Sequence, residues 1–354
     1  LIDIMRRLIF FLELISLLAV LVGCAPNPTL MPTPPLTQIP FEMLDEAKIE
    51  LITLLGQVTE PRAEISGMAW CGNHLILLPQ YPGQYCTDAS GFVFSIPRDQ
   101  IFHYLKDASG SGIKPSMIPF DQGGLDQSIK GFEGFESITF YDDQFFASIE
   151  SRQGGDMMGY LVKGAVQGDC EALAVEPDSI IEVYPQADLD NISDETLLIY
   201  QDLLFSIYEA NGENVNPNPV THVFDLGLNF IEDRPLPNVE YRITDATDVD
   251  EDGKFWAINY FFPGDTKLKP ASDQIAFEYG LGHSHVGAEG VERIIAMQIT
   301  DARVILADET PLYIELYEEE SRNWEGIVRF EDGFLLVTDK FPTTLLTFVR
   351  NINQ

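Results

Sequence analysis

From residue 46 onward, the chain is a succession of short apolar runs separated by turn residues. The clearest case is WEGIVRFEDGFLLVTDK at 324–340, where two apolar runs flank a Glu-Asp-Gly turn. β-branched and aromatic residues are frequent in these runs, and Asp-Gly, Asp-Asp or Gly-Asn stands at several of the turns. This combination is typical of β-hairpins. The pattern therefore predicts an all-β domain.

The hairpin pattern recurs along the chain in a common register. If Glu325 is position zero of its hairpin, matching hairpins start at Ser66, Glu136, Glu195 and Asp245. An apolar residue follows at or next to position +9, and the hairpins that start at Ser66, Glu136, Glu195 and Glu325 match one another in a polar residue at position +14. Further strand-like runs fill each interval. Repetition of this kind predicts an array of similar four-stranded units.

The two ends of this domain complement each other. A single strand-like run, at 343–349, follows the last hairpin, and the run at 48–55 has no hairpin of its own. If the N-terminal run completes the last unit, no sheet edge stays open. We therefore predict a β-propeller of five four-stranded antiparallel blades, closed by the N-terminal strand. A six-bladed propeller with a degenerate blade near 302–308, and a β-sandwich with accidental hairpin similarity, are the alternatives.

The first 24 residues have the features of a targeting segment. Arg6 and Arg7 precede an apolar stretch at 8–22, which ends in Gly23-Cys24. A cysteine after small residues at this place resembles a bacterial lipobox, whose cysteine is lipidated after cleavage. We predict that Cys24 anchors the protein to a bacterial membrane on its extracytoplasmic side. A plain signal peptide and a transmembrane anchor are the alternatives.

Between this segment and the hairpins, the chain is rich in Pro and Thr. Residues 25–45 begin with APNPTLMPTPPLTQIP, which is almost free of charge. Such sequences are semi-extended spacers. We therefore predict a tether over 25–45 and a propeller domain over 46–354.

Charge and cysteine content restrict the partners and the covalent links. The chain has 56 Asp+Glu against 21 Lys+Arg, a net charge of −35. Such a surface repels phosphate backbones, so we predict no nucleic-acid partner. We expect a monomer that binds a small molecule or a protein on the propeller face. Export permits a disulfide, and Cys71 and Cys86 flank a predicted strand pair, so they are a possible bridge; Cys170 either pairs or stays buried.

The residues at position zero suggest a site. In a propeller the innermost strand of each blade lines the central channel, so Ser66, Glu136, Glu195, Asp245 and Glu325 are expected to converge at one end of it. Carboxylates held close together raise each other's pKa values. A hard cation with oxygen ligands, Ca²⁺ first and Mg²⁺ or Mn²⁺ next, would compensate their charge. We therefore hypothesise that the four acidic residues bind a metal; alternatively, they accept hydrogen bonds from neighbouring backbone and fix the ring.

Two other motifs carry candidate chemistry. His283 and His285 lie in the long insertion 261–290, where they could act as acid and base or bind a metal over the channel mouth. DVDEDG at 248–253 matches the opening of a calcium loop, but Asn259 stands where that loop has its bidentate Glu. Because Asp-Gly is the strongest hairpin signal, we predict a turn there.

Two hairpins resemble those of the gluconolactonase and senescence-marker-protein propellers. Trp324-Glu325-Gly326-Ile327 matches the Glu-Gly of that family's metal-binding hairpin, without the Pro that follows it there. The stretch at 245–257 is similar to the hairpin that carries the family's metal-binding Asp, and Glu195 stands near the place of its Asn ligand. A vaguer likeness connects the hairpins to the esterase-like phytase propellers of exported bacterial proteins. Both resemblances cover the hairpins and not the connecting loops, and they imply a propeller with a metal site.

Two functions follow from these features. One is a Ca²⁺-dependent hydrolase of lactone or phosphate-ester type, in which the bound metal polarises the scissile oxygen. The other is a non-catalytic propeller that binds a ligand or a protein, with the acidic ring in a structural role.

Overall fold

The computed structural model describes residues 42–85, 91–107, 110–317, 321–340 and 343–353. The chain divides into two units, 1–40 and 41–354, and every described residue belongs to the second. The predicted lipobox with Cys24, most of the tether and Cys86 lie outside the described residues. Among the residues that are described, no helix combines the length and the apolar character needed to cross a membrane.

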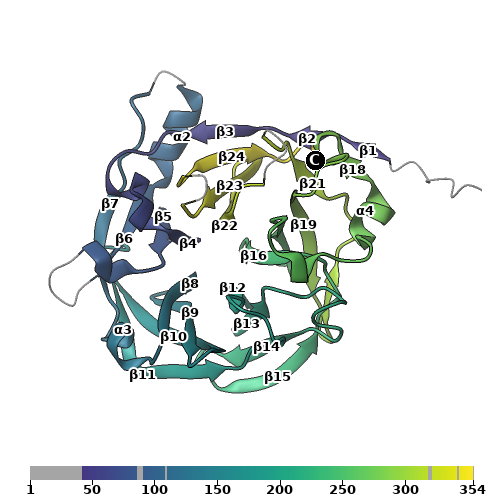
Figure 1. The fold of residues 1–354 in the computed structure, drawn as a ribbon. Helices are drawn as coiled ribbons and strands as arrows, with labels where there is room; N and C mark the ends of the chain where they lie inside the picture. Colours follow the sequence, from purple (N-terminus) through teal and green to yellow (C-terminus); the bar gives the residue numbers. More distant parts are fainter. Residues whose placement is uncertain (1–41, 86–90, 108–109, 318–320, 341–342, 354) are drawn as a thin grey trace, which may run out of the picture. The chain divides into compact units, whose positions relative to one another are not determined.

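The described unit is all-β, as predicted, and its sheets surround a common centre (Figure 1). The largest sheet contains, in spatial order, β4 (Ile65–Cys71), β5 (His74–Pro79), β6 (Gly91–Pro97), β7 (Ser116–Asp121), β11 (Ala172–Val183), β10 (Asp156–Gln167), β9 (Gln144–Gln153) and β8 (Phe132–Tyr141). The next sheet contains β12 (Asp194–Tyr200), β13 (Leu203–Tyr208), β14 (Val220–Asp225) and β15 (Phe230–Pro235).

The remaining sheets include the N-terminal strands. One contains β16 (Arg242–Ala246), β17 (Lys254–Phe261), β19 (Val291–Ile299), β21 (Leu312–Ile314) and β2 (Glu46–Ala47), with β20 (Val304–Leu306) paired to β19. Another contains β22 (Trp324–Phe330), β23 (Gly333–Thr338), β24 (Leu346–Arg350) and β3 (Ile49–Ile52). A short parallel pair joins β1 (Met43–Leu44) to β18 (Leu281–Gly282). Within the described ranges the α-helices are α2 (Arg98–Lys106), α3 (Leu125–Ser128) and α4 (Gln274–Tyr279).

Burial on both faces explains the continuous apolar runs. All six residues of β23, GFLLVT, are buried, and so are five of the six residues of β5. A strand packed on both faces needs apolar side chains at consecutive positions, and not only at alternate ones. The inner strands β4, β8, β12, β16 and β22 contact one another in sequence, and β22 returns to β4. Their sheets therefore surround a centre, as the sheets of a propeller do.

The chain ends close the ring as the sequence predicted. β3 pairs antiparallel with β24, with Ile49 opposite Val349, and Figure 1 shows the two strands side by side. The N-terminal segment does more than this, because β2 pairs with β21 and β1 with β18. It thus connects two neighbouring sheets, a role that the hairpin pattern did not indicate.

The division into sheets differs from the predicted one. β7 and β11 pair in parallel, with Phe120 opposite Leu173, and this pair merges the sheets of the first two hairpins. The 302–308 segment contributes β20 to the sheet of the fourth hairpin. In the described residues it adds a strand to an existing sheet and does not start a sheet of its own.

Position zero has a structural meaning in every inner strand. The ladder of each hairpin skips a residue there: Ser66 in β4, Glu136 in β8, Glu195 in β12 and Glu325 in β22, whereas β16 skips both Thr244 and Asp245. A β-bulge of this kind frees a residue from the regular alternation and re-aims its side chain. The sequence repeat therefore marks a series of bulges.

The predicted Cys71–Cys86 bridge is wrong, because Cys71 pairs with Cys170. Cys71 ends β4, and Cys170 lies in the turn between β10 and β11 with its Cα 6.1 Å from that of Cys71. The two residues are 99 positions apart in the sequence. They meet because the β7–β11 pair places the second hairpin unit beside the first, a contact that cysteine spacing does not show.

Removal of this bridge should destabilise the domain markedly. Because it closes a loop of about 100 residues, the Cys71→Ala/Cys170→Ala variant is expected to lose about 2–4 kcal/mol of unfolding free energy. Guanidinium denaturation under non-reducing conditions measures the loss. Cys86→Ala is the control and should leave the midpoint within experimental error, whereas an equal loss in both variants would contradict the assigned pairing.

Candidate functional site

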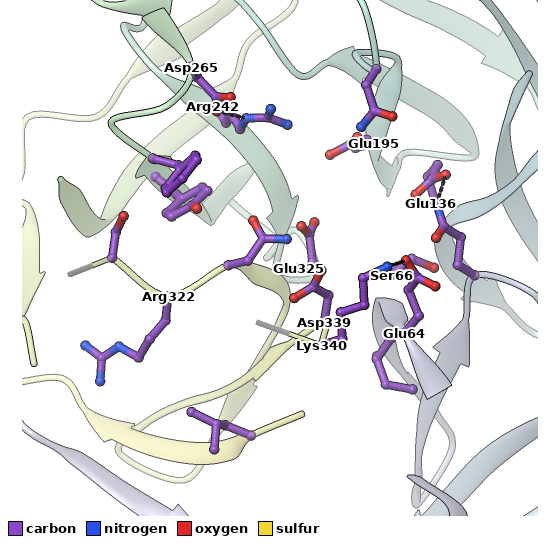
Figure 2. Close-up of a pocket in the computed structure, with 18 of the residues that line it drawn as sticks. Glu64, Ser66, Glu136, Glu195, Arg242, Asp265, Arg322, Glu325, Asp339 and Lys340 are labelled. Atoms are coloured by element: carbon purple, nitrogen blue, oxygen red, sulfur yellow. Dashed lines mark hydrogen bonds and ion pairs between the residues drawn. The ribbon is translucent and has the colours of Figure 1, made fainter. Parts of the chain in front are cut away.

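A cavity of about 1410 Å³ lies where the bulges of the inner strands meet (Figure 2). Its acidic lining residues are Glu64, Glu133, Glu136, Glu195, Asp265, Glu315, Glu325 and Asp339. Its basic lining residues are Lys48, Arg242, Arg322 and Lys340. Acids thus outnumber bases two to one along the wall, in keeping with the net charge of the chain.

Three of the four predicted ligands face this cavity. Glu136, Glu195 and Glu325 occupy the bulges of β8, β12 and β22, and each lines the wall. Figure 2 shows them reaching toward the same space from different inner strands. The bulges therefore bring together carboxylates that are far apart in the sequence.

Asp245 does not join them. Its Oδ2 accepts a hydrogen bond of 2.8 Å from the backbone N–H of Ile327, and the residue is absent from the cavity wall. This is the structural role that the sequence analysis gave as the alternative. Asp245 therefore links β16 to the neighbouring inner strand.

Thr244, the residue before Asp245, takes the place that corresponds to Ser66. The Ser66 hydroxyl donates to the carbonyl of Phe135 at 2.6 Å, and the Thr244 hydroxyl donates to the carbonyl of Trp324 at 2.7 Å. In both cases the acceptor immediately precedes a position-zero glutamate. The sequence register of the fourth hairpin was therefore displaced by one residue, because its bulge contains two.

A second set of acids, which the sequence analysis did not select, backs the first. Position +14 of the same hairpins holds Glu150, Glu209 and Asp339. Glu150 and Glu209 are almost completely buried. The repeat register was the signal that could have identified them, because Glu150 lies on β9, Glu209 directly follows β13 and Asp339 directly follows β23, the strands paired with those of the bulged glutamates.

Burial and mutual repulsion raise the pKa values of the cavity glutamates. Burial is the largest cause for Glu136, Glu195 and Glu325, and raises the pKa of each well above its ordinary value. The next cause in each case is the acid at +14 of the same hairpin. Three hairpins thus each supply a carboxyl pair in which the charge of the member at +14 disfavours ionisation of the bulged glutamate.

The pKa values of Glu150 and Glu209, the members at +14 of two of these hairpins, are raised as well. Burial, followed by the charge of Glu209, raises the pKa of Glu150 to about 8. One carboxyl oxygen of Glu150, and one of Glu209, has no hydrogen-bond partner among the described residues. Such oxygens are costly to bury as anions, and they favour a proton, a water molecule or a cation beside them.

Arg242 is paired with one of these buried acids. It opens β16, pairs with the carboxylate of Glu209, and donates from Nε to Oδ2 of Asp265 at 2.8 Å. Burial raises the pKa of Glu209, and Arg242 opposes that rise. The charge of Arg242 also opposes the rise in the pKa of Glu195 and Glu325, and the charge of Arg152 opposes that of Glu150.

Two further basic residues of the wall are held by acids. Lys340 pairs with Glu64, and Nη2 of Arg322 pairs with Oε2 of Glu292 at 2.7 Å. The buried carboxylate of Glu292 also accepts a hydrogen bond of 2.7 Å from Nε1 of Trp324. Each of these two positive groups is therefore held in place by a carboxylate.

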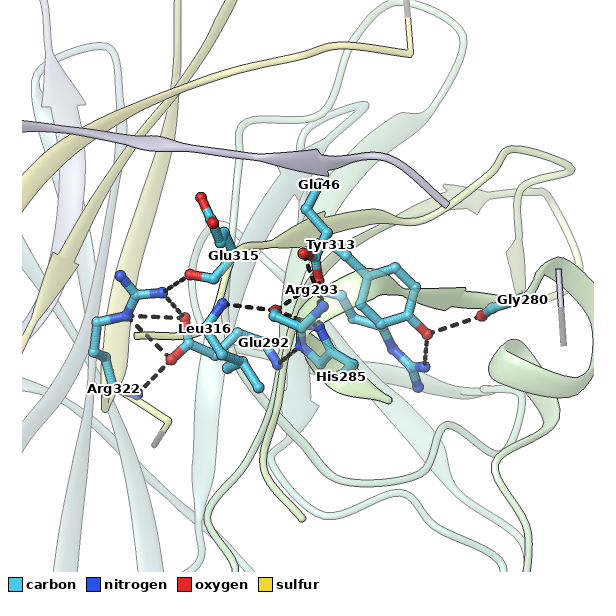
Figure 3. Close-up of polar contacts among 10 residues, drawn as sticks. Glu46, Gly280, His285, Glu292, Arg293, Tyr313, Glu315, Leu316 and Arg322 are labelled. Carbon is cyan, nitrogen blue, oxygen red and sulfur yellow. Dashed lines mark hydrogen bonds and ion pairs between the residues drawn. The ribbon is translucent and has the colours of Figure 1, made fainter. Parts of the chain in front are cut away.

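The two candidate histidines do not face the cavity. His285 is buried; its Nδ1 lies 2.8 Å from Oε1 of Glu46, and its Nε2 accepts the backbone N–H of Glu292 at 3.1 Å (Figure 3). Both ring nitrogens are thus used to fasten β2 to the 283–285 turn. His283 is exposed at the start of that turn. Neither residue lines the cavity, so the geometry gives no support to an acid–base pair at its mouth.

The calcium-like motif at 248–253 is a hairpin turn, as predicted. The Asp250 N–H donates to the carbonyl of Lys254 at 2.9 Å, and the Gly253 N–H donates to the carbonyl of Asp250 at 3.0 Å. Oδ1 of Asp250 accepts the backbone N–H groups of Asp252 and Lys254. The Asp250 carboxylate therefore stabilises the turn through these backbone hydrogen bonds.

The donor set of the cavity suits a hard cation in chemistry and charge, because it consists of carboxylate oxygens. In their present positions, however, no three His, Cys, Asp or Glu side chains of the described residues are grouped closely enough to surround a metal ion. The predicted set of four is reduced to Glu136, Glu195 and Glu325 by the position of Asp245.

No family model and no curated protein matches this chain. Solved structures with a distant likeness include a bifunctional GH43-CE protein of Bacteroides eggerthii (TM-score 0.45, 10% identity, 84% of this chain and 34% of that one). Another belongs to the GH130 family of mannoside phosphorylases, which contains glycoside hydrolases that target β-1,2 mannosidic linkages in Candida mannan (TM-score 0.47, 9% identity, 89% of this chain and 97% of that one). A third is Zg3597, a family 117 glycoside hydrolase of Zobellia galactanivorans (TM-score 0.44, 10% identity, 87% of this chain and 91% of that one). The chain spans about a third of the first of these proteins, and TM-scores this low carry no argument about its function.

Proposed function

We propose that the protein is an exported, lipid-anchored β-propeller of five blades that hydrolyses a small ester, a lactone or a phosphate ester, in its central cavity with the help of a bound Ca²⁺. One observation carries the proposal: three bulged glutamates, each backed by a second acid, face one cavity of about 1410 Å³. A cavity of that size has room for a substrate of several hundred daltons.

The cation is proposed because the acids need a positive partner. Glu136, Glu195 and Glu325 would hold it, since each lines the wall and each has a raised pKa. A divalent ion replaces the protons that burial otherwise favours, and its oxygen-only coordination matches these side chains. When bound, it would polarise the scissile oxygen as a Lewis acid.

The chain's own residues would bind the substrate and move the proton. Lys340 and Arg322 line the wall and are each held by a carboxylate, so they would orient the negative oxygens of an ester or a phosphate. Asp339 lines the cavity next to Glu325 (Figure 2). Its carboxylate is placed to accept a proton from an attacking water molecule, as a general base does.

The test combines metal content, stability and turnover. Wild-type protein is expected to retain Ca²⁺ and to melt at a higher temperature with CaCl₂ than with a chelator, because a ligand that binds only the folded state stabilises it. Glu325→Gln and Glu195→Gln should each lose the ion of the cavity and the turnover. The matched control is Glu182→Gln, which changes an exposed acid on β11 and should behave as wild type.

A panel of lactones and phosphate monoesters then tests the reaction. Unchanged metal content and melting in both cavity variants would overturn the cation site. Retained metal without turnover on any member of the panel would overturn the assignment as an ester hydrolase.

A further inference from the structure

A second oxygen-rich site lies away from the central cavity, in the loop between β13 and β14. Residues 211–216 read NGENVN. The loop turns tightly at Gly212, whose carbonyl accepts the backbone N–H groups of Val215 at 3.1 Å and Asn216 at 2.8 Å. Its side chains are therefore held on a compact turn.

A buried carboxylate meets this turn from the segment between β15 and β16. Glu240 is only 8% exposed, and its backbone carbonyl is fixed by the side-chain amide of Asn259 at 2.8 Å. One oxygen, Oε1, accepts a long hydrogen bond of 3.4 Å from the backbone N–H of Glu213. The other oxygen, Oε2, is buried and accepts no hydrogen bond from the described residues.

Asn214 supplies a second oxygen beside that one. Its Nδ2 donates to the carbonyls of Lys267 at 2.9 Å and Lys269 at 3.3 Å, and this fixes the amide so that Oδ1 is the oxygen left on the other side. A Cβ built on Gly212 would lie 3.0 Å from Oδ1 of Asn214 and would collide with Oε2 of Glu240. Both oxygens therefore border the space that the missing side chain of Gly212 leaves open.

The neighbouring residue adds another unsatisfied oxygen. Asn211 is completely buried, its Nδ2 donates to the carbonyl of Tyr208, and its Oδ1 has no hydrogen-bond partner among the described residues. Buried oxygens without donors cost free energy unless something positive satisfies them. Asn, Glu and backbone oxygens are the ligands that Ca²⁺ takes in proteins.

We propose that the 211–216 loop and Glu240 bind a divalent cation of the Ca²⁺ type, with Glu240 and Asn214 as side-chain ligands. None of Asn211, Asn214 and Glu240 lines the central cavity, so this site is separate from the one that the proposed function uses. Burial, helped by the nearby charges of Asp273 and Glu213, raises the pKa of Glu240. A cation would take the place of the proton that this environment favours.

The site would join two connections of the fold. The loop follows β13, Glu240 precedes β16, and Asn214 bonds to backbone at 267–269. A cation here would therefore fasten the loops of two adjacent sheets on the side where Arg242 and Asp265 reach the cavity. Its expected role is to stabilise the wall of the cavity and not to take part in a reaction.

The experiment is calorimetric titration of the full domain, first freed of metal, with CaCl₂ and in parallel with MgCl₂. It is run in the Glu325→Gln background, which removes the cation proposed for the cavity. One equivalent of Ca²⁺ is expected to bind there, and Glu240→Gln added to that background should weaken its affinity at least tenfold. Glu182→Gln, an exposed acid, is the matched control and should leave the affinity unchanged.

A second variant covers the possibility that Glu240→Gln does not fold. Gly212→Ala places a methyl group in the space between the two oxygens and should abolish the same binding event. Unaltered Ca²⁺ binding in both variants, or no Ca²⁺ binding at all in the Glu325→Gln background, would overturn the proposal. The cavity site is tested independently, because Ca²⁺ binding there is measured as the difference in bound Ca²⁺ between wild type and Glu325→Gln.

Discussion

In the presence of a chelator, the protein is expected to be more stable at mildly acidic pH than at alkaline pH. The reason lies in Glu136, Glu195 and Glu325, whose pKa values burial raises well above the ordinary value, and in Glu150, whose pKa rises to about 8. For each group the folded state holds its proton more tightly than the unfolded state does. Stability from these protons is complete below the unfolded pKa near 4.5 and is lost as the pH rises through the folded value.

The stability of the protein should depend strongly on pH, because several carboxyl groups contribute. Each unit by which a folded pKa exceeds the unfolded one is worth about 1.4 kcal/mol, and several groups are shifted in the same direction. His285 acts with the opposite sign, because burial lowers its pKa and its contribution disappears as the pH falls below the unfolded value near 6.5. One histidine opposes a set of carboxyl groups, so the net slope between pH 4.5 and pH 8 should follow the carboxyl groups.

Urea denaturation across this pH range, with a chelator and then with excess CaCl₂, checks the expectation. The free energy of unfolding should fall with pH in the chelator series. CaCl₂ should flatten the curve if a cation replaces the protons. Glu150→Gln should remove part of the slope, and Glu182→Gln should leave it unchanged. A metal-free protein that gains stability toward alkaline pH would show that these carboxyl groups are ionised in the folded state without penalty.

The hairpin register could be predicted from the sequence because it is a local property. The spacing of apolar runs and turn residues depends on pairing within each hairpin, and β8–β9, β12–β13 and β22–β23 are paired as the repeat indicated. The ring closure by β3 followed from counting strands. The convergence of three glutamates on one cavity followed in turn from their common position in the hairpins.

The predictions that were wrong concern features that depend on contacts between hairpins. The Cys71–Cys170 bridge needs the parallel β7–β11 pair, which no local pattern encodes. The register of Asp245 failed because the bulge of β16 holds two residues, so that Thr244 took the equivalent place. His285 looked like a loop histidine, but its imidazole is buried against Glu46, 239 residues earlier in the chain.

The acids at position +14 could have been predicted from the sequence, since they share the register of the bulged glutamates. They were missed because their importance comes from burial, which becomes visible only when the sheets are placed around the cavity. The same holds for Glu240, which is one acid among 56 in the sequence. Only in the fold does it become a buried carboxylate facing an asparagine-rich turn.

Replacement of Arg242 is expected to be among the most damaging single changes in the domain. Arg242→Met keeps the apolar stem but removes the guanidinium that pairs with Glu209 and Asp265. Glu209 has no exposed side-chain surface, so it would be left as a buried carboxylate without its counter-ion. Loss of one partner of a buried ion pair costs about 3–5 kcal/mol, because the remaining charge can neither be solvated nor paired.

The pH dependence of the loss identifies its cause. At mildly acidic pH, Glu209 can take up a proton and become neutral, so the penalty of Arg242→Met should be smaller there than at alkaline pH. Glu209→Gln combined with Arg242→Met should recover part of the loss, since the second change removes the unpaired charge. Urea denaturation of the single and double variants at pH 4.5 and pH 8 gives the coupling energy of the pair.

Arg350→Met is the matched control for this pair. Arg350 bonds to Asp332 at 2.9 Å, but both side chains are more than half exposed, and such a pair contributes about 0–1 kcal/mol. If Arg242→Met cost no more than this control, or if Glu209→Gln gave no recovery, the repulsion among the buried acids would be relieved by something other than Arg242. If the expected pattern is found, Arg242 is the residue that allows Glu209 to stay ionised behind the cavity. Glu150, whose pKa is raised to about 8, instead favours a proton or a cation beside it.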